Sequence, residues 1–278
     1  MSNYKIIILI LCLSWGILQA EETDIYNIKN NMTSKQKMIG VIGGVSWEST
    51  TLYYKLINEF VRERLGGLNS AKILLYSLNY NPIVELERQG KWNDVGNELA
   101  HAAKTLQEGG ADFIILCCNT LHKMTFCIEK TVHIPFLHIA DPAGNILKNN
   151  NIQKVGLLGT QFTMEDGFYA SRLTDKFDLE VVIPCEEERK DLDSIIYGEL
   201  CQGKTSPESK QKLIRIIQNL NEQGAEAILL GCTELGMLIH NGDVEVPIYD
   251  TTLLHANEAA GWSINQIRHL LEPVEAKN

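Results

Sequence analysis

An internal repeat constrains the fold of this chain more than any other feature of its sequence. The segment LQEGGADFIILCCNTL (106–121) aligns without a gap with LNEQGAEAILLGCTEL (220–235), and eight of the sixteen positions are identical. Upstream, IGVIGG (39–44) aligns with VGLLGT (155–160), at an offset of 116 residues against 114 at the cysteines. Because identity and spacing agree at both ends, the repeat indicates two copies of one structural unit.

Each copy alternates short apolar runs with longer amphipathic segments. The apolar runs are 38–44, 71–78, 111–118, 154–160, 179–184 and 226–232. Strands that alternate with helices in this way are typical of parallel sheets covered on both faces. The pattern predicts an α/β fold with two pseudo-symmetric domains, each a mostly parallel sheet flanked by helices, and an active site in the cleft between them.

We place the first domain at residues 38–145 and the second at 146–249. Residues 250–278 are expected to return to the first domain. The chain has 278 residues, of which 45% are hydrophobic, and this is enough for two domains with cores of their own. Its net charge of −10 argues against a nucleic-acid partner or an anionic membrane surface.

The first twenty residues differ from the rest of the chain. A positive start, the apolar stretch IIILILCLSWGI (6–17) and a small residue before an acidic pair are typical of a cleavable signal peptide (1–20). The apolar stretch is too short for a stable membrane anchor, and the polar residues 21–37 resemble a linker. We therefore expect a periplasmic or secreted protein that has no membrane attachment after cleavage. Translation from Met32 or Met38 would instead give a cytoplasmic protein, and both alternatives stay open.

Two neighbouring cysteines follow one of the apolar runs, and the repeat distinguishes between them. Cys118 aligns with Cys232, whereas Cys117 aligns with Gly231. Each aligned cysteine directly follows the carboxyl end of a predicted buried strand, where open α/β sheets bind their ligands. We predict that Cys118 and Cys232 are a catalytic pair on either side of the cleft and that Cys117 is a packing residue.

The sequence contains no recognisable cofactor site. The cysteines lack the C-x-x-C and H-x-x-x-H spacing of a zinc site. The turn GGVSWEST (43–50) is neither a dinucleotide fingerprint nor a Walker A motif. We therefore predict neither a metal nor an organic cofactor.

Polar residues next to the cysteines are candidates for binding a carboxylate. Asn119, Thr120 and Thr233 lie where strands end and helices are expected to begin, so unpaired backbone N–H groups accompany their side chains. Val45 and Ser46 lie in a glycine-rich turn that allows the backbone to approach a ligand closely. Each polar residue could equally cap its helix.

Two thiols on opposite sides of a carboxylate site suit one kind of reaction. To invert an α-carbon, a base removes the proton from one face and an acid returns a proton to the other. Thiols can act in either role, and donors to the carboxylate stabilise the carbanion. This chemistry is racemisation without a cofactor.

At this point the sequence resembles the aspartate/glutamate racemases of the Asp/Glu/hydantoin racemase superfamily. The matching stretches include IGVIGGVSWESTTLYYKLIN (39–58), LCCNTLHK (116–123), GLLGTQFTME (156–165), IIYGELCQG (195–203), LGCTELG (230–236) and DTTLLHA (250–256). The resemblance implies two pseudo-symmetric α/β domains, catalytic cysteines at Cys118 and Cys232, no cofactor, and a homodimer.

The resemblance also implies an amino-acid substrate, with aspartate or glutamate expected first. Arg88, Arg189 and Lys190 are candidates for holding the distal carboxylate, and Glu199 is a candidate for the substrate ammonium. The alternatives are a racemase of broader or hydantoin-type specificity and a non-catalytic periplasmic amino-acid binding protein. The sequence does not assign either enantiomer to either cysteine.

Overall fold

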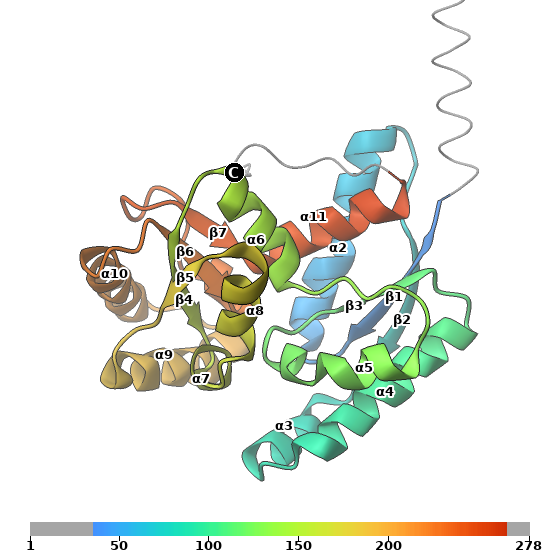
Figure 1. The fold of residues 1–278 in the computed structure, drawn as a ribbon, viewed down its shortest axis with the longest axis horizontal. Helices are drawn as coiled ribbons and strands as arrows, with labels where there is room; N and C mark the ends of the chain where they lie inside the picture. Colours follow the sequence, from blue (N-terminus) through green and yellow to red (C-terminus); the bar gives the residue numbers. More distant parts are fainter. Residues whose placement is uncertain (1–35, 266–278) are drawn as a thin grey trace, which may run out of the picture.

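The computed structural model describes residues 36–265, which form two lobes that each contain one parallel sheet (Figure 1). The predicted signal peptide (1–20) lies outside the described residues, as do residues 21–35 of the predicted linker and residues 266–278. Among the described residues, no helix combines the length and the apolarity needed to cross a membrane.

The first lobe contains a three-stranded sheet of order β2-β1-β3, with both strand pairs parallel. Its strands are β1 (Met38–Gly43), β2 (Lys72–Ser77) and β3 (Phe113–Leu116), and its main helices are α2 (Trp47–Leu65), α4 (Trp92–Glu108) and α11 (Thr251–Ser263). Ile39 and Val41 pack toward α2 and α11, whereas Ile42 packs toward α4. The sheet is therefore covered on both faces, as parallel sheets are.

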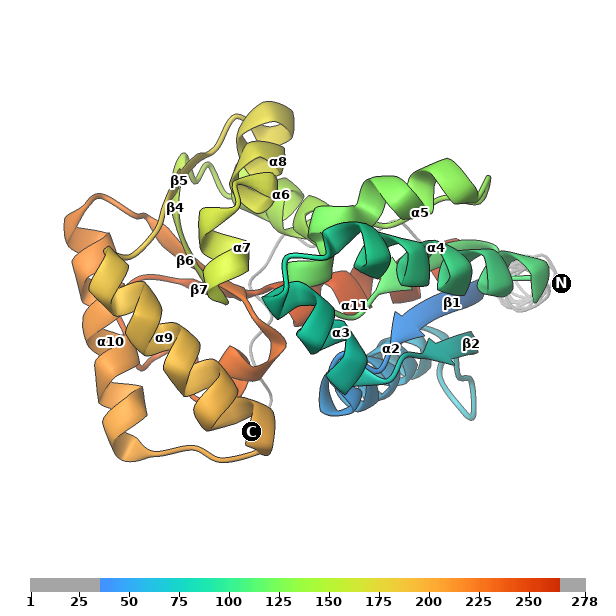
Figure 2. The same cartoon turned by 90° about the horizontal axis from the view of Figure 1, so that it is seen from below.

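The second lobe contains a four-stranded parallel sheet of order β5-β4-β6-β7. Its strands are β4 (Lys154–Gly159), β5 (Glu180–Val182), β6 (Ala227–Gly231) and β7 (Ile248–Asp250), and its main helices are α6 (Ala140–Asn149), α8 (Phe168–Phe177), α9 (Glu186–Gly198) and α10 (Pro207–Glu222). Leu158 and Leu230 pack with α9 and α10, while Leu157 and Leu229 pack with α6 and α8. Figure 2 shows α9 and α10 side by side on one flank of this lobe.

Short helices connect these elements, and several of them lie where the lobes meet. They are α3 (Tyr80–Arg88), η1 (Thr120–Met124), α5 (Thr125–Thr131), α7 (Gln161–Glu165), η2 (Leu200–Gln202) and η3 (Thr233–Met237). The turns η1 and η3 are 3₁₀ helices of five residues each, and they follow β3 and β6. The helices expected after the two cysteines are therefore short 3₁₀ turns.

The strand registers of the two lobes agree with the sequence repeat. In the first lobe Ile39 lies opposite Phe113, and in the second Val155 lies opposite Ala227. These pairs occupy equivalent positions of the two aligned segments. The predicted α/β fold of two parallel sheets flanked by helices is confirmed, with three strands in one sheet and four in the other.

The chain crosses between the lobes twice. Ile139, Ala143 and Leu147 of the α6 region pack in the second core, so the boundary predicted between residues 145 and 146 falls inside a helix of the second lobe. After β7 the chain returns, and Ala256 and Ala260 of α11 pack against the α2 side of the first sheet. The two crossings hold the ends of β3 and β6 close to the interface between the lobes.

Candidate active site

A cavity between the lobes lies at the carboxyl ends of the central strands. Its volume is about 40 Å³ for molecules of the size of water, within about 430 Å³ of space between atoms that includes open solvent. The residues that line it are Val45, Ser46, Tyr80, Glu87, Cys118, Asn119, Thr120, Thr160, Ile196, Tyr197, Cys201, Gly231, Cys232, Thr233 and Glu234. Of the eight predicted site residues, seven therefore line this one cavity.

Cys118 and Cys232 lie at equivalent places on opposite sides of this cavity. Cys118 follows β3 and Cys232 follows β6. The backbone N–H of Thr120 donates a hydrogen bond to the sulfur of Cys118, and the N–H of Glu234 donates one to the sulfur of Cys232. Thr120 and Glu234 occupy the same position of the repeat, but the sulfur of Cys118 also accepts from the N–H of Leu121, so Cys118 has one backbone donor more than Cys232.

The environment of both thiols favours the protonated form. Burial raises the pKa of the Cys118 thiol, and the carboxylate of Glu87 raises it further. Burial also raises the pKa of the Cys232 thiol well above its usual value, and the carboxylate of Glu234 adds to this effect. The backbone N–H groups act in the opposite direction because they stabilise a thiolate. The empty cavity therefore holds two neutral thiols, and a nearby base or a bound cation is needed to form a thiolate.

Glu234 is the base in contact with one of these thiols. The Cys232 thiol donates a hydrogen bond to Glu234 Oε2 at 3.1 Å, and the hydroxyl of Thr233 donates to the same oxygen. From the first lobe, Ser46 Oγ donates to Glu234 Oε1 at 3.0 Å. Glu234 thus links Cys232 to the turn after β1, and it can accept the proton of the Cys232 thiol.

We expect Glu234→Gln to lower the pKa of the Cys232 thiol, because the substitution removes the negative charge beside the sulfur. The measurement is the pH dependence of alkylation at Cys232, read by mass spectrometry of the peptide that contains it. The midpoint should move to lower pH than in the wild type. Glu48→Gln, at an exposed position of α2, is the control and should leave the midpoint unchanged. An unchanged or higher midpoint in Glu234→Gln would show that the carboxylate does not act on the thiol.

The polar residues beside the thiols also connect the two lobes. Thr120 Oγ1 lies 2.9 Å from Thr160 Oγ1, and Asn119 Nδ2 donates to Thr251 Oγ1 at 3.1 Å. Ser46 caps α2 by accepting from the N–H of Ser49, and it also lines the cavity. These bonds hold the hydroxyl and amide groups at the cavity wall.

Glu199 does not line the cavity, unlike the other predicted site residues. Tyr197, two residues earlier at the end of α9, does line it. Glu199 follows Gly198, the last residue of α9, and has a non-helical backbone conformation; its Oε1 accepts from Ser209 Oγ at 2.8 Å. Glu199 is therefore not placed to hold a substrate ammonium in this cavity.

The three cationic side chains that were candidates for holding the distal carboxylate of the substrate also lie outside the cavity. Arg189 Nε forms an ion pair with Glu165 at 2.6 Å, and Lys190 Nζ pairs with Glu186 at 2.6 Å. Arg88 is exposed and lines an outer hollow that does not include the two thiols. None of the three lines the cavity that contains Cys118 and Cys232.

Sequence reasoning missed several residues of the cavity wall. Tyr80 and Glu87 come from α3, Tyr197 from α9 and Cys201 from η2. These helices lie outside the repeated segments, so the repeat gave no signal for them. Thr160 could have been predicted from the repeat, because it ends the aligned segment VGLLGT and occupies the position of Gly44 in the other copy.

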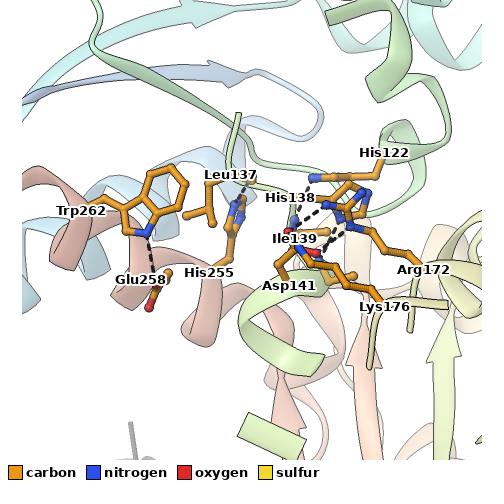
Figure 3. A network of polar contacts seen from close by, with 11 residues as sticks. His122, Leu137, His138, Ile139, Asp141, Arg172, Lys176, His255, Glu258 and Trp262 are labelled. Carbon is orange, nitrogen blue, oxygen red and sulfur yellow. Dashed lines mark hydrogen bonds and ion pairs between the residues drawn. The ribbon is translucent and has the colours of Figure 1, made fainter. Parts of the chain in front are cut away.

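Three buried histidines, His122, His138 and His255, lie close together (Figure 3). The ring of His122 accepts at Nε2 from the N–H of Ile139, so its Nδ1 carries the proton and donates to the carbonyl of Cys118. Likewise, His255 Nε2 donates to the carbonyl of Leu137 at 2.9 Å. Each ring is thus held as one neutral tautomer, and His122 ties the Cys118 backbone to the segment that crosses into the second lobe.

We expect this cluster to make the fold less stable in mild acid. Burial lowers the pKa of His255 to about 4, below the value of about 6.5 in an unfolded chain. A lowered folded pKa gives stability that is complete above pH 6.5 and is lost as the pH falls toward 4, because only the unfolded chain binds the proton. His255 alone should account for about 2 kcal/mol of lost stability at pH 5.

The measurement is urea unfolding at pH 7 and pH 5. His255→Gln should lose less stability between these pH values than the wild type, and the exposed control His133→Gln should lose as much as the wild type. Equal losses in all three proteins would contradict a role for His255.

Among residues 36–265, no group of three or more histidine, cysteine or acidic side chains is placed to hold a metal ion. The cavity wall instead provides thiols, hydroxyls, one amide and two carboxylates. These groups suit proton transfer and hydrogen bonding to a small polar molecule.

Comparisons with known proteins identify the relatives of the chain. The Asp/Glu/Hydantoin racemase family model matches residues 42–259. The crystal structure of a candidate Asp/Glu racemase from Yersinia pestis is 45% identical, with a TM-score of 0.78, over 82% of this chain and 99% of that one. An aspartate racemase homologue from Pyrococcus horikoshii is 34% identical, with a TM-score of 0.72 and the same coverage. The broad specificity amino-acid racemase RacX of Bacillus subtilis is 25% identical over 77% of this chain and 93% of its own length.

Proposed function

This chain belongs to the Asp/Glu/hydantoin racemase family, and we propose that it is a cofactor-independent amino-acid racemase whose acid and base are Cys118 and Cys232. One observation carries the proposal. Two thiols from equivalent strand ends of the two lobes line one cavity, and each accepts a hydrogen bond from the backbone N–H two residues further along the chain. Opposed acid and base groups of this kind are what inversion of an α-carbon requires.

The reaction begins with the loss of one thiol proton. Cys232 gives its proton to the carboxylate of Glu234, with which it already shares a hydrogen bond. The resulting thiolate takes the Cα proton from one face of the amino acid, and the thiol of Cys118 gives its proton to the opposite face. Afterwards Cys118 is the thiolate and Cys232 the thiol, so the same pair catalyses the reverse reaction.

The carbanion formed in the first step needs stabilisation without an electron sink. Its negative charge spreads onto the substrate carboxylate, and donors aimed at that carboxylate lower the barrier. Asn119, Thr120 and Thr233 line the cavity beside the thiols. We assign the donor role to Asn119 and Thr120, because the single hydroxyl proton of Thr233 is already donated to Glu234. A substrate ammonium in the cavity would also lower the pKa of either thiol.

The test of this proposal is isotope exchange. The reduced protein is incubated in deuterated water with single L-amino acids, and Cα deuteration is followed together with formation of the D isomer. We expect both to occur with no added cofactor. Binding of an amino acid without any Cα exchange would instead support the alternative of a non-catalytic binding protein.

Two further predictions from the sequence stay proposals. A homodimer is supported by Trp47 and Tyr54, which are exposed on α2, and by Leu75, which is exposed on the edge strand β2. Analytical ultracentrifugation of the intact chain checks this.

Export depends on residues 1–20, and the test is whether these residues are absent from the mature protein.

A further inference from the structure

The charge of the cavity wall bears on which substrate side chains the cavity can bind. Among the described residues that line the cavity, none is a lysine, an arginine or a histidine. The charged candidates are Glu87 and Glu234, and Glu234 is already bonded to Cys232, Thr233 and Ser46. A second carboxylate on the substrate would meet no cation here and would face a carboxylate in Glu87.

Glu87 has an exposed fraction of 5%, and within residues 36–265 its carboxylate forms no hydrogen bond or ion pair. The charges of Arg88 and Lys123 act on it and lower its pKa, but neither group is paired with it, since Arg88 is exposed and Lys123 pairs with Asp166 at 2.8 Å. Burial raises the pKa of Glu87 to about 7, as expected for a carboxylate that has lost its hydration. A buried carboxylate of this kind is strongly stabilised by a cation or a hydrogen-bond donor.

The position of Glu87 matches the path of a substrate side chain. Glu87 of α3 and Tyr197 of α9 line both the cavity with the thiols and the outer hollow, which also includes Asp193. A side chain that leaves the α-carbon between the thiols and runs outward therefore reaches Glu87 and Tyr197 before the outer hollow, where Arg88 also lies. Val45, Ile196 and the ring of Tyr80 form apolar parts of the wall and suit the methylene groups of such a side chain.

We propose that Glu87 selects amino acids whose side chain ends in an ammonium or guanidinium group. This inference rests on the proposed racemase activity. It replaces the expectation of an acidic substrate with a basic one, because the wall offers a buried, unpartnered carboxylate and no cation. Glu87 is the specificity-determining residue, and Val45, Ile196 and the ring of Tyr80 share the cavity wall with its carboxylate.

The test compares L-lysine with L-norleucine and L-glutamate by Cα deuteration. Norleucine differs from lysine by the loss of the terminal ammonium, so the ratio of their kcat/KM values isolates that group. We expect lysine to exceed norleucine by about 10- to 100-fold, as for a hydrogen bond to a charged group, and to exceed glutamate by more. Faster exchange of glutamate than of lysine in the wild type would overturn the assignment.

The matched variants are Glu87→Gln and Glu85→Gln, two residues apart on α3. Because the charge of Glu87 also acts on the Cys118 thiol, Glu87→Gln can change exchange of every substrate, and we expect it to lower the ratio of lysine to norleucine exchange at least tenfold. Glu85 is exposed, so its variant should leave this ratio unchanged. An equal loss for lysine and norleucine in Glu87→Gln would mean that Glu87 holds the α-ammonium, and it would overturn the assignment to the side chain. Loss of glutamate exchange in Arg88→Gln would identify Arg88 as the selecting group instead.

Calorimetric binding separates failure of this inference from failure of the proposed activity. If no amino acid shows Cα exchange, the racemase proposal fails. Lysine that still binds at least tenfold more tightly than norleucine, with the difference lost in Glu87→Gln, would then support Glu87 as the recognition group. Equal binding of lysine and norleucine by the wild type would overturn that role.

Discussion

Replacing Cys118 or Cys232 by serine is expected to lower racemisation by a factor of about 10³ in each case, within the range of about 10² to 10⁴ that general acid–base catalysis contributes. A serine hydroxyl is close in size to a thiol but far less acidic, so it neither loses nor gives a proton at a useful rate. The measurement is formation of the D isomer from the best L substrate, with reductant present.

The double variant Cys118→Ser/Cys232→Ser gives a sharper test of the paired mechanism. When two groups act as a unit, removing the second costs little after the first is lost. The double variant should therefore be no more than a few times slower than the slower of the two single variants. Fully additive losses would indicate that each thiol acts independently.

Cys185→Ser is the matched control for these variants. Cys185 is exposed at the start of α9, outside the cavity, and serine is a favoured residue at such a helix start. We expect its rate to equal that of the wild type. Cys201 also lines the cavity, so it is not a suitable control. A wild-type rate in either Cys118→Ser or Cys232→Ser would remove that residue from the mechanism.

Gly44→Ala is expected to destabilise the fold by about 3–5 kcal/mol, which is large for a single methyl group. Gly44 has φ +88°, and an added Cβ would lie 2.1 Å from the carbonyl oxygen of Leu78 and 2.5 Å from its nitrogen. Both contacts are with backbone atoms that cannot move aside without disturbing the end of the first sheet. Leu78 also donates to the carbonyl of Gly43 at 2.9 Å, so the strand end itself would be displaced.

The same substitution should lower activity, because Val45 and Ser46 directly follow Gly44 and line the cavity. Gly203→Ala is the matched control. Gly203 has φ +70° and ψ 20°, in the left-handed helical region, and an added Cβ would meet nothing within 4 Å, so only the backbone strain of about 1 kcal/mol is expected. Free energies of unfolding from urea titrations check both values. If the two variants differ by less than about 1 kcal/mol, the close approach to Leu78 is not what requires glycine at this position.

In the proposed assignment, the residues that select the substrate side chain differ from the residues that transfer the proton. The thiols and the residues beside them lie on the repeated strand ends, whereas Glu87, Tyr80 and Tyr197 lie on helices that are not repeated. Side-chain preference can therefore vary through α3 and α9 without any change at the strand ends.

Much of the architecture could be predicted from residue order alone. Apolar runs of strand length alternating with amphipathic segments predicted parallel sheets, since parallel neighbours need a crossover connection. The repeat predicted that Cys118 and Cys232 occupy equivalent positions, and the registers Ile39 to Phe113 and Val155 to Ala227 are indeed equivalent. These inferences succeeded because hydrophobic period and repeat spacing are properties of local sequence.

The cavity residues that lie outside the repeated strand ends could not be predicted from the sequence, because long-range packing brings them to the cavity. Glu199 was predicted beside the substrate, but it lies just past the end of α9 and bonds to Ser209, whereas Tyr197 lines the cavity. Glu87 looks like an ordinary helix-surface charge in the sequence, and it becomes buried at the cavity because α3 packs where the lobes meet. Residue spacing within one strand or helix is set by backbone geometry and can be read from the sequence. The partners of a side chain across two lobes depend on how separate elements pack, and no local pattern records that arrangement.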